Sequence, residues 1–287
     1  QPNHPYSRKA APMFGRRKIQ YKTNQELRAM VRAGVVTSQA LDAAVEATAP
    51  GVTTAELDRT FRDVLDRNGA TSNFLGYYGF PATICASPND VVVHGIPNDR
   101  PLEDGDIVSI DGGAIVDGWH GDSARTVLVG ETSRQDAELS EMTRAAMWRG
   151  IAAAATAQRV GEIGAAIESF VRKEAGGTYG IVEEYVGHGI GTEMHMAPDV
   201  PNYRTRDSGP RIKPGMALAI EPMLVTGSTQ TEVLDDDWTV KTVDGSHASQ
   251  WEHSVAFHRD GIWVLTAEDG GANELAALGV TVAPIPD

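Results

Sequence analysis

The chain has 287 residues, of which 41% are hydrophobic, and its 25 basic against 39 acidic side chains give a formal charge of −14. This length and composition allow one large domain or two small ones, with a full hydrophobic core. The negative charge argues against a nucleic-acid-binding role, and no DNA partner is expected, because phosphates would be repelled. The sequence contains no run of eighteen apolar residues, so no membrane span or membrane partner is predicted.

Cysteine usage limits the chemistry further. Cys85 is the one cysteine of the sequence, which excludes an internal disulfide framework and any zinc site built from paired cysteines. A bound metal would therefore be held by oxygen and imidazole ligands. No secretory signal opens the sequence, so a cytoplasmic location is the default expectation.

The first 22 residues carry six basic side chains, and the first acidic residue is Glu26. A run of charge of this kind is most often a solvated tail. The sharper hypothesis is a basic arm that makes transient contact with ribosomal RNA while the acidic remainder stays away. We expect residues 1–23 to form a flexible N-terminal arm.

Four helices are predicted, in two pairs. Residues 24–48 carry apolar side chains at helical spacing up to Pro50 and Gly51, which end the pattern. A second helix is expected from Thr53, which forms a capping box with Glu56, to Asn68. The same scheme returns as helices over residues 136–157 and 160–175.

Strands are predicted between and after these helices, at residues 82–86, 91–94, 106–111, 119–129, 216–223, 239–243, 251–257 and 262–266. The glycine-rich segment 187–191 is predicted to be a loop. Since no linker divides the chain, we predict one α+β domain over residues 24–268, with a curved antiparallel sheet and the four helices on its outer face. Residues 269–287 form a C-terminal tail to which the sequence assigns no role.

Two similar segments suggest that the domain is an internal duplication. The run GDIVSID at 105–111 and the run GMALAIE at 215–221 each end in an acidic residue, and their offset is 215 − 105 = 110. Two related halves would then deliver one carboxylate each, Asp111 and Glu221, to a shared place. Chance similarity of two strands is the alternative.

Asp111 and Asp122 flank a predicted hairpin with its turn at Asp117-Gly118. Pairing positions then sum to about 235, which makes the two aspartates diagonal neighbours roughly 7–8 Å apart at Cα. Carboxylates buried this close to one another repel unless a cation or a proton intervenes. Taken singly, either aspartate would more often belong to a structural salt bridge.

Further candidate ligands lie later in the chain. His188 lies in the glycine-rich segment, and Glu221 ends a strand before Pro222. Glu252 lies on a strand in which His253 points to the opposite face, because successive side chains of a strand alternate. With the two aspartates these residues supply four carboxylates and one imidazole. Such a set suits a pair of manganese, iron(II), cobalt or zinc ions about 3.5–4 Å apart. Each acidic residue alone would usually be a cap or a surface group.

Six motifs from residue 24 to residue 268 closely resemble those of the type I methionine aminopeptidases, of the bacterial type without a zinc-finger extension. The motifs follow in the same order and at compatible spacing, and they are VVHGIP at 92–97, DIVSID at 106–111, HGDS at 120–123, GHGIG at 187–191, IEPM at 220–223 and QWEH at 250–253. Val93 departs from the family, in which a cysteine often precedes the histidine. The resemblance implies the pita-bread fold and a catalytic domain over residues 24–268.

The resemblance also implies the roles of the site residues. Asp111 would be the bidentate ligand of one ion, His188 and Glu221 ligands of the other, and Asp122 and Glu252 the bridging pair. Glu221 would also accept the proton during attack. His195 would hydrogen-bond the substrate carbonyl, and His94 the amide nitrogen of the next residue, although His94 alone would be taken as a core histidine.

By resemblance, the pocket for the substrate side chain is formed by Tyr77, Phe80, Cys85, Met194 and Trp238, with Phe74 near its rim. Without the resemblance, Tyr77, Phe80 and Cys85 would be read as core residues. An apolar, aromatic-lined pocket is what an unbranched, polarizable methionine side chain fits.

The expected function is therefore metal-dependent removal of N-terminal methionine from nascent polypeptides by a monomer, favouring a small second residue because a bulky one would crowd His94. Xaa-Pro aminopeptidases and prolidases share the ligand pattern and are one alternative. Those enzymes normally carry a large extra N-terminal domain, whereas here the first ligand comes 111 − 1 = 110 residues after Gln1. A non-catalytic binding module is the other alternative, although all five ligand positions and both histidines are present.

Overall fold

The structure is a computed structural model that describes residues 18–287. Its helices are α1 (Asn24–Ala47), α2 (Thr54–Arg67), α3 (Arg134–Ala154), α4 (Gly161–Ala175) and α5 (Ala272–Ala277), with a 3-10 turn at Tyr77–Gly79. Its strands are β1 (Thr71–Ser72), β2 (Ile84–Pro88), β3 (Val91–Val93), β4 (Ile107–Val116), β5 (Trp119–Leu128), β6 (Gly180–Ile181), β7 (Gly187–Gly189), β8 (Met196–Val200), β9 (Ala217–Ile220), β10 (Met223–Val225), β11 (Thr231–Val233), β12 (Val240–Thr242), β13 (Ala248–Gln250), β14 (Glu252–His258) and β15 (Gly261–Val264).

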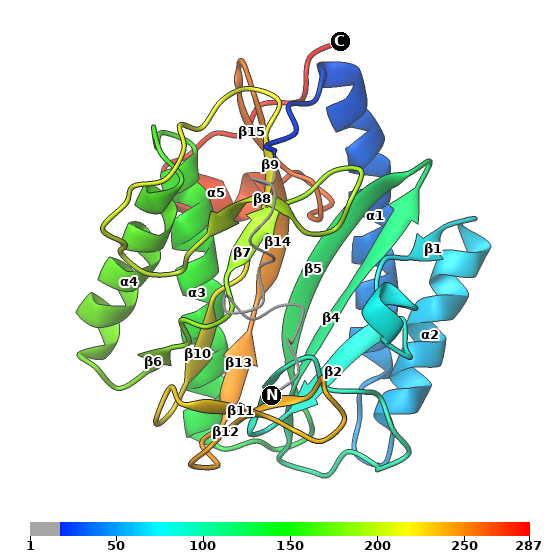
Figure 1. Cartoon of the computed structure of the whole chain (residues 1–287). Helices are drawn as coiled ribbons and strands as arrows, with labels where there is room; N and C mark the ends of the chain where they lie inside the picture. Colours follow the sequence, from blue (N-terminus) through cyan, green and yellow to red (C-terminus); the bar gives the residue numbers. More distant parts are fainter. Residues whose placement is uncertain (1–17) are drawn as a thin grey trace.

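A nine-stranded sheet forms the centre of the molecule. Its main path runs β1-β4-β5-β14-β9-β7-β8, with β2 on β4 and β15 on β14. β14 pairs antiparallel with β5 from the first half and with β9 from the second. Helices α1 and α2 lie beside β4 and β5, while α3 and α4 lie on the other side of the molecule (Figure 1). The predicted α+β architecture is confirmed.

The four long helices begin and end close to the predicted positions. Thr53 and Glu56 form both hydrogen bonds of the expected capping box, and a second box, Thr23 with Glu26, begins α1. Each box satisfies backbone donors that the first helical turn leaves without partners. Within residues 18–287, none of the helices combines the length and the apolar character needed to cross a bilayer.

The internal duplication is visible in equivalent turns. α1 and α3 start at residues 24 and 134, and β4 and β9 start at residues 107 and 217, so both offsets are 110. Gly105 and Gly215, which precede the two strands, have φ of +95° and +91°, a conformation that glycine adopts without steric cost. Their amides donate to Val129 O at 2.8 Å and to Phe257 O at 2.7 Å. The two halves thus build the same turn before each carboxylate-bearing strand.

Several segments differ from the predicted strands and loops. β4 continues to Val116, past the predicted end at residue 111, and the strands β1, β6, β8, β11 and β13 were not predicted. The strand expected over residues 216–223 is interrupted at Glu221 and Pro222, and its two parts join different sheets. The loop expected at residues 187–191 contains β7, which pairs with β8 and β9. A Cβ on Gly187 would lie 2.2 Å from Ala219 O. The glycines therefore serve close packing of strand backbones, which the prediction of a loop missed.

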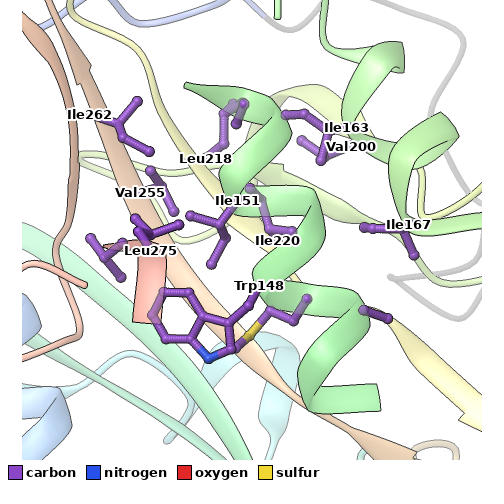
Figure 2. Packing of buried hydrophobic residues seen from close by; sticks show 14 of the residues in the cluster. Trp148, Ile151, Ile163, Ile167, Val200, Leu218, Ile220, Val255, Ile262 and Leu275 are labelled. Carbon is purple, nitrogen blue, oxygen red and sulfur yellow. The ribbon is translucent and has the colours of Figure 1, made fainter. Parts of the chain in front are cut away.

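The larger apolar core lies between α3, α4 and the second half of the sheet. Trp148 and Ile151 of α3 lie in one cluster with Val255 and Leu218 (Figure 2). Leu275 of α5 is fully buried in the same cluster. The C-terminal segment 269–287, which had no predicted role, thus contributes to the core.

Part of the predicted N-terminal arm is described. Residues 1–17 lie outside the described residues. Lys22 is buried, its Nζ donates to Ile190 O, and its backbone N–H donates to Gly215 O at 2.8 Å. Burial lowers the Lys22 pKa to about 8. The last residues of the predicted arm therefore contact the rest of the protein.

Gly34 of α1 allows the helix to approach the backbone near β15, because a Cβ there would lie 2.1 Å from Leu265 O. We expect Gly34→Ala to destabilise the protein by about 1–3 kcal/mol in chemical denaturation, although alanine is the better helix former. Gly150→Ala in α3 is the matched control, since its Cβ would meet side-chain carbons of Ile167 and Ile163, the nearest at 2.8 Å, and no backbone atom among its three nearest neighbours. Equal unfolding free energies for the two variants would contradict this account.

Candidate metal centre

The hairpin of β4 and β5 positions two carboxylates. Its register pairs Gly113 with Asp122 and Asp111 with Ala124, which confirms the predicted pairing sum of 235. Asp117 and Gly118 in the turn both have positive φ, as a type I′ hairpin turn requires. Asp111 and Asp122 therefore share one face of the sheet.

The second half brings an imidazole and a carboxylate to the same face. His188 of β7 donates from Nδ1 to Gly189 O at 2.9 Å, so the lone pair lies on Nε2. That Nε2 is 3.4 Å from Glu221 Oε1 and 3.9 Å from Asp122 Oδ2. Asp122, His188 and Glu252 each place one ligand atom within 4.8 Å of the others.

The donor set fits a metal centre. Each of the five residues is exposed by 8% or less. Burial raises the pKa of Asp111 to about 7, and burial together with the neighbouring carboxylates raises the pKa of Asp122, Glu221 and Glu252 well above the ordinary range. Asp111 Oδ1, Asp122 Oδ1 and Glu252 Oε1 have no hydrogen-bond partner within residues 18–287. Buried, mutually repelling oxygens of this kind are stabilised by divalent cations.

Sequence reasoning missed two residues that hold these ligands. Gln250 Nε2 donates to Asp111 Oδ2 at 3.2 Å and to Glu221 Oε2 at 3.3 Å, so one amide joins carboxylates from both halves. Asn202 Nδ2 donates to Glu221 O at 3.2 Å. Gln250 lies inside the QWEH motif two residues before Glu252, which was an available signal, whereas nothing in the sequence singled out Asn202.

Two further histidines stand beside the carboxylates. His94 follows β3 with φ of +61°, and its ring lies 5.4 Å from that of Tyr185. The ring centroid of His195 is 4.2 Å from that of His188, and its Nδ1 is hydrogen-bonded to Tyr77 Oη at 3.0 Å. His253 lies on the other face of β14, bonded to Thr266, as the strand alternation predicts.

A cavity with about 380 Å³ of free space, including its open mouth, joins these groups. Its wall is formed by Phe74, Phe80, Cys85, His94, Asp111, Asp122, His188, His195, Glu221, Trp238 and Glu252. Met194 belongs to the same apolar cluster as Phe74 and Trp238, and Tyr77 packs against that cluster. All residues predicted for the site are thus brought together.

The apolar side of the cavity is aromatic. The rings of Phe80 and Trp238 meet edge to face at 5.0 Å, and those of Phe74 and Phe80 at 6.3 Å. Burial and the nearby carboxylates raise the pKa of the Cys85 thiol far above its usual range. The thiol is therefore neutral, and Cys85 is an apolar wall residue.

Gln250→Met should weaken metal binding by about 10–100-fold, because the amide that orients Asp111 and Glu221 is lost while the side-chain volume is kept. Isothermal titration of the metal-free protein with Mn²⁺ measures this directly. Gln230→Met is the matched control, since Gln230 is exposed on a loop. Unchanged affinity in Gln250→Met, with unchanged thermal stability of the metal-free protein, would show that Gln250 does not position the ligands.

Comparison with known proteins agrees with this geometry. The family model "Metallopeptidase family M24" matches residues 28–259. "Methionine aminopeptidase 1" of Mycobacterium tuberculosis is 49% identical over 90% of this chain and 99% of that protein. "Methionine aminopeptidase 1" of Bacillus subtilis is 42% identical over 85% of this chain and 98% of that protein.

Solved structures show the same fold. The methionine aminopeptidase of Rickettsia prowazekii superposes with a TM-score of 0.83 at 37% identity, covering 87% of this chain and 100% of that one. A prolidase of Pyrococcus furiosus superposes with a TM-score of 0.69 at 23% identity, covering 86% of this chain and 65% of that one. The fold is thus the pita-bread fold expected from the motifs, and the chain belongs to metallopeptidase family M24.

Proposed function

We propose that this protein removes the N-terminal methionine from polypeptides in a metal-dependent hydrolysis. The observation that carries the proposal is the direct contact between a buried carboxylate–imidazole cluster and an aromatic pocket in one cavity. The match to the curated relatives named methionine aminopeptidase spans nearly the whole length of those proteins, which supports the same activity here.

For the metal, we propose two divalent ions, with cobalt, manganese, iron(II) and zinc as the candidates. Asp111 would hold one ion, His188 and Glu221 the other, and Asp122 and Glu252 would bridge them. Such a pair supplies an activated water near neutral pH and a Lewis acid for the scissile carbonyl. The buried oxygens without hydrogen-bond partners support this assignment.

The protein's own groups orient the substrate and move the proton. If Tyr77 Oη donates to His195 Nδ1, His195 Nε2 carries a hydrogen and can donate to the substrate carbonyl oxygen as negative charge develops there. His94, which lines the same cavity, would contact the amide nitrogen of the next residue. Glu221, held by Gln250 and close to His188, is the proposed proton acceptor.

The aromatic pocket accounts for the choice of side chain. Phe74, Phe80, Cys85 and Trp238 give the cavity an apolar wall beside the carboxylates, to which Met194 and Tyr77 contribute from the surrounding cluster. The unbranched thioether side chain of methionine would fill a pocket with such a wall and make sulfur–aromatic contacts. A small second residue would be favoured because a bulky one would crowd His94, which lines the same cavity.

The activity is tested with Met-Ala, Met-Leu and Xaa-Pro peptides in the presence of added Mn²⁺. We expect Met-Ala to be cleaved most efficiently, because its second side chain avoids His94. Preferential hydrolysis of Xaa-Pro peptides would support the prolidase-like alternative instead. The likeness to prolidases, at 23% identity, supports the fold alone.

Two variants separate metal binding from turnover. His195→Ala should keep the metal content but lower kcat about 10²–10³-fold, since it removes a donor to the developing oxyanion. Asp122→Ala should lose bound metal, because it removes a proposed bridging carboxylate. Elemental analysis combined with steady-state kinetics distinguishes the two outcomes, and metal loss in His195→Ala would refute its assignment as a substrate-binding group.

We also propose transient ribosome contact through the basic N-terminal arm, a monomeric state and a cytoplasmic location. Six basic residues in the first 22, against an overall charge of −14, support the arm proposal. Deleting residues 1–17 should reduce co-sedimentation with ribosomes, because those residues carry most of these charges. Unchanged co-sedimentation would refute the ribosome contact. Light scattering tests the monomeric state, and cell fractionation tests the cytoplasmic location.

A further inference from the structure

Exposed apolar side chains gather beside the cavity. Within residues 18–287, seven large hydrophobic side chains are exposed: Tyr21, Leu75, Tyr78, Leu128, Val233, Leu234 and Val243. Four of them lie in two segments, 74–80 and 231–239, that also supply the aromatic residues of the cavity wall. Single exposed apolar residues are ordinary, but a group next to a binding cavity indicates a contact surface.

The first segment presents Tyr78 to solvent. Tyr78 is 73% exposed and has φ of +47°, an unusual conformation for an aromatic residue. The segment is closed by hydrogen bonds from Gly76 N to Phe80 O at 2.8 Å and from Leu75 N to Ser72 Oγ at 3.1 Å. A fixed backbone, not fraying, therefore holds Tyr78 outward.

Tyr78 is directly connected to the site. Its ring lies 4.7 Å from that of Tyr77, edge to face. Tyr77 in turn is hydrogen-bonded to His195 at 3.0 Å. The exposed ring therefore continues the aromatic surface that begins inside the cavity.

The second segment is joined to the same wall. Leu234 N donates to Thr239 O at 2.9 Å, and Asp236 accepts from Trp238 N at 2.9 Å, so the turn after β11 is fixed. Trp238 meets Phe80 of the first segment at 5.0 Å. The exposed residues Val233 and Leu234 thus belong to a segment that is held close to the wall residue Trp238.

We propose that these two segments form a docking surface for the third and fourth residues of the substrate polypeptide. The surface prefers apolar over acidic side chains at these substrate positions. The inference rests on the proposed function, since a polypeptide whose first side chain fills the cavity must leave across this rim. An extended chain advances about 3.3 Å per residue, which brings its third and fourth residues to the rim. The exposed acids Glu232, Asp235 and Asp237 on the second segment repel an anionic substrate chain.

The occupant is the substrate and not a second copy of the protein, because the surface is continuous with the cavity that takes the substrate side chain. The acidic turn also argues against a second copy, since two copies that met at this turn would bring like charges together. Apolar rim residues and nearby acids together suit a neutral or basic, partly apolar peptide segment.

The test compares kcat/KM for Met-Ala with that for Met-Ala-Xaa-Xaa amides in which Xaa is Leu, Ser or Asp. In the unaltered protein we expect the Leu peptide to exceed the Ser peptide about fivefold, mainly through KM, and the Asp peptide to be poorest. Tyr78→Asn removes the ring but suits the left-handed backbone, and it should reduce the Leu-to-Ser ratio to about one. Tyr78→Phe should restore the ratio.

Leu128→Asn is the matched control, because Leu128 is an exposed apolar residue at the end of β5, and the ratio should stay unchanged. The double variant Leu75→Ser with Val233→Ser tests the same ratio without touching the Tyr77 contact. A Leu-to-Ser ratio that persists in both Tyr78→Asn and the double variant overturns the docking surface. Failure of the unaltered protein to cleave Met-Ala overturns the proposed function instead.

Discussion

Mutual repulsion among four buried carboxylates is the constraint on which the structure depends. Asp111, Asp122, Glu221 and Glu252 are almost fully shielded from water, and enclosing them raises their proton affinity. Such an arrangement persists only on a framework that cannot relax, because any freedom would let the charges separate or reach solvent. The sheet must therefore be stiff where it carries them.

A buried network of hydroxyl groups lies beside the carboxylates, on the same face of β4 and β5, and supplies this stiffness. Ser109 and Thr126 hydroxyls lie 3.0 Å apart, Thr126 and Ser249 hydroxyls 2.9 Å apart, and Thr126 Oγ1 also donates to Gln250 O at 2.7 Å. These bonds link β4, β5 and β13, and a buried network in which each member has partners favours one geometry over others. Gln250 extends the network to Asp111 and Glu221, so the backbone of the sheet and these carboxylate oxygens are fixed together.

Local features made much of the fold and the placement of Asp111 and Asp122 predictable, whereas the roles of the histidines and the pocket residues were predicted from the family resemblance. The Thr53 capping box, the Asp117-Gly118 turn and the resulting placement of Asp111 and Asp122 depend on neighbours within a few residues. The 110-residue offset likewise survives as equivalent glycine turns at Gly105 and Gly215. Local structure that depends on residues a few positions apart can therefore be predicted from a single sequence.

Long-range contacts account for what was missed. Residues 187–189 form a strand because the backbone of Ala219, which is distant in sequence, approaches Gly187, and a glycine-rich run does not reveal such a partner. Asn202 reaches Glu221 across 19 positions. Gln250 joins Asp111, which lies 139 positions earlier in the chain, and Glu221, which lies 29 positions earlier. These roles exist only once the chain is folded.

The position of β14 has a consequence for how the molecule unfolds. This strand carries Glu252 and is hydrogen-bonded on one side to β5 and on the other to β9. Opening either half on its own would strip one edge of β14 and expose its buried residues to water. Because β14 is shared in this way, we expect the two halves to unfold together and not as separate units.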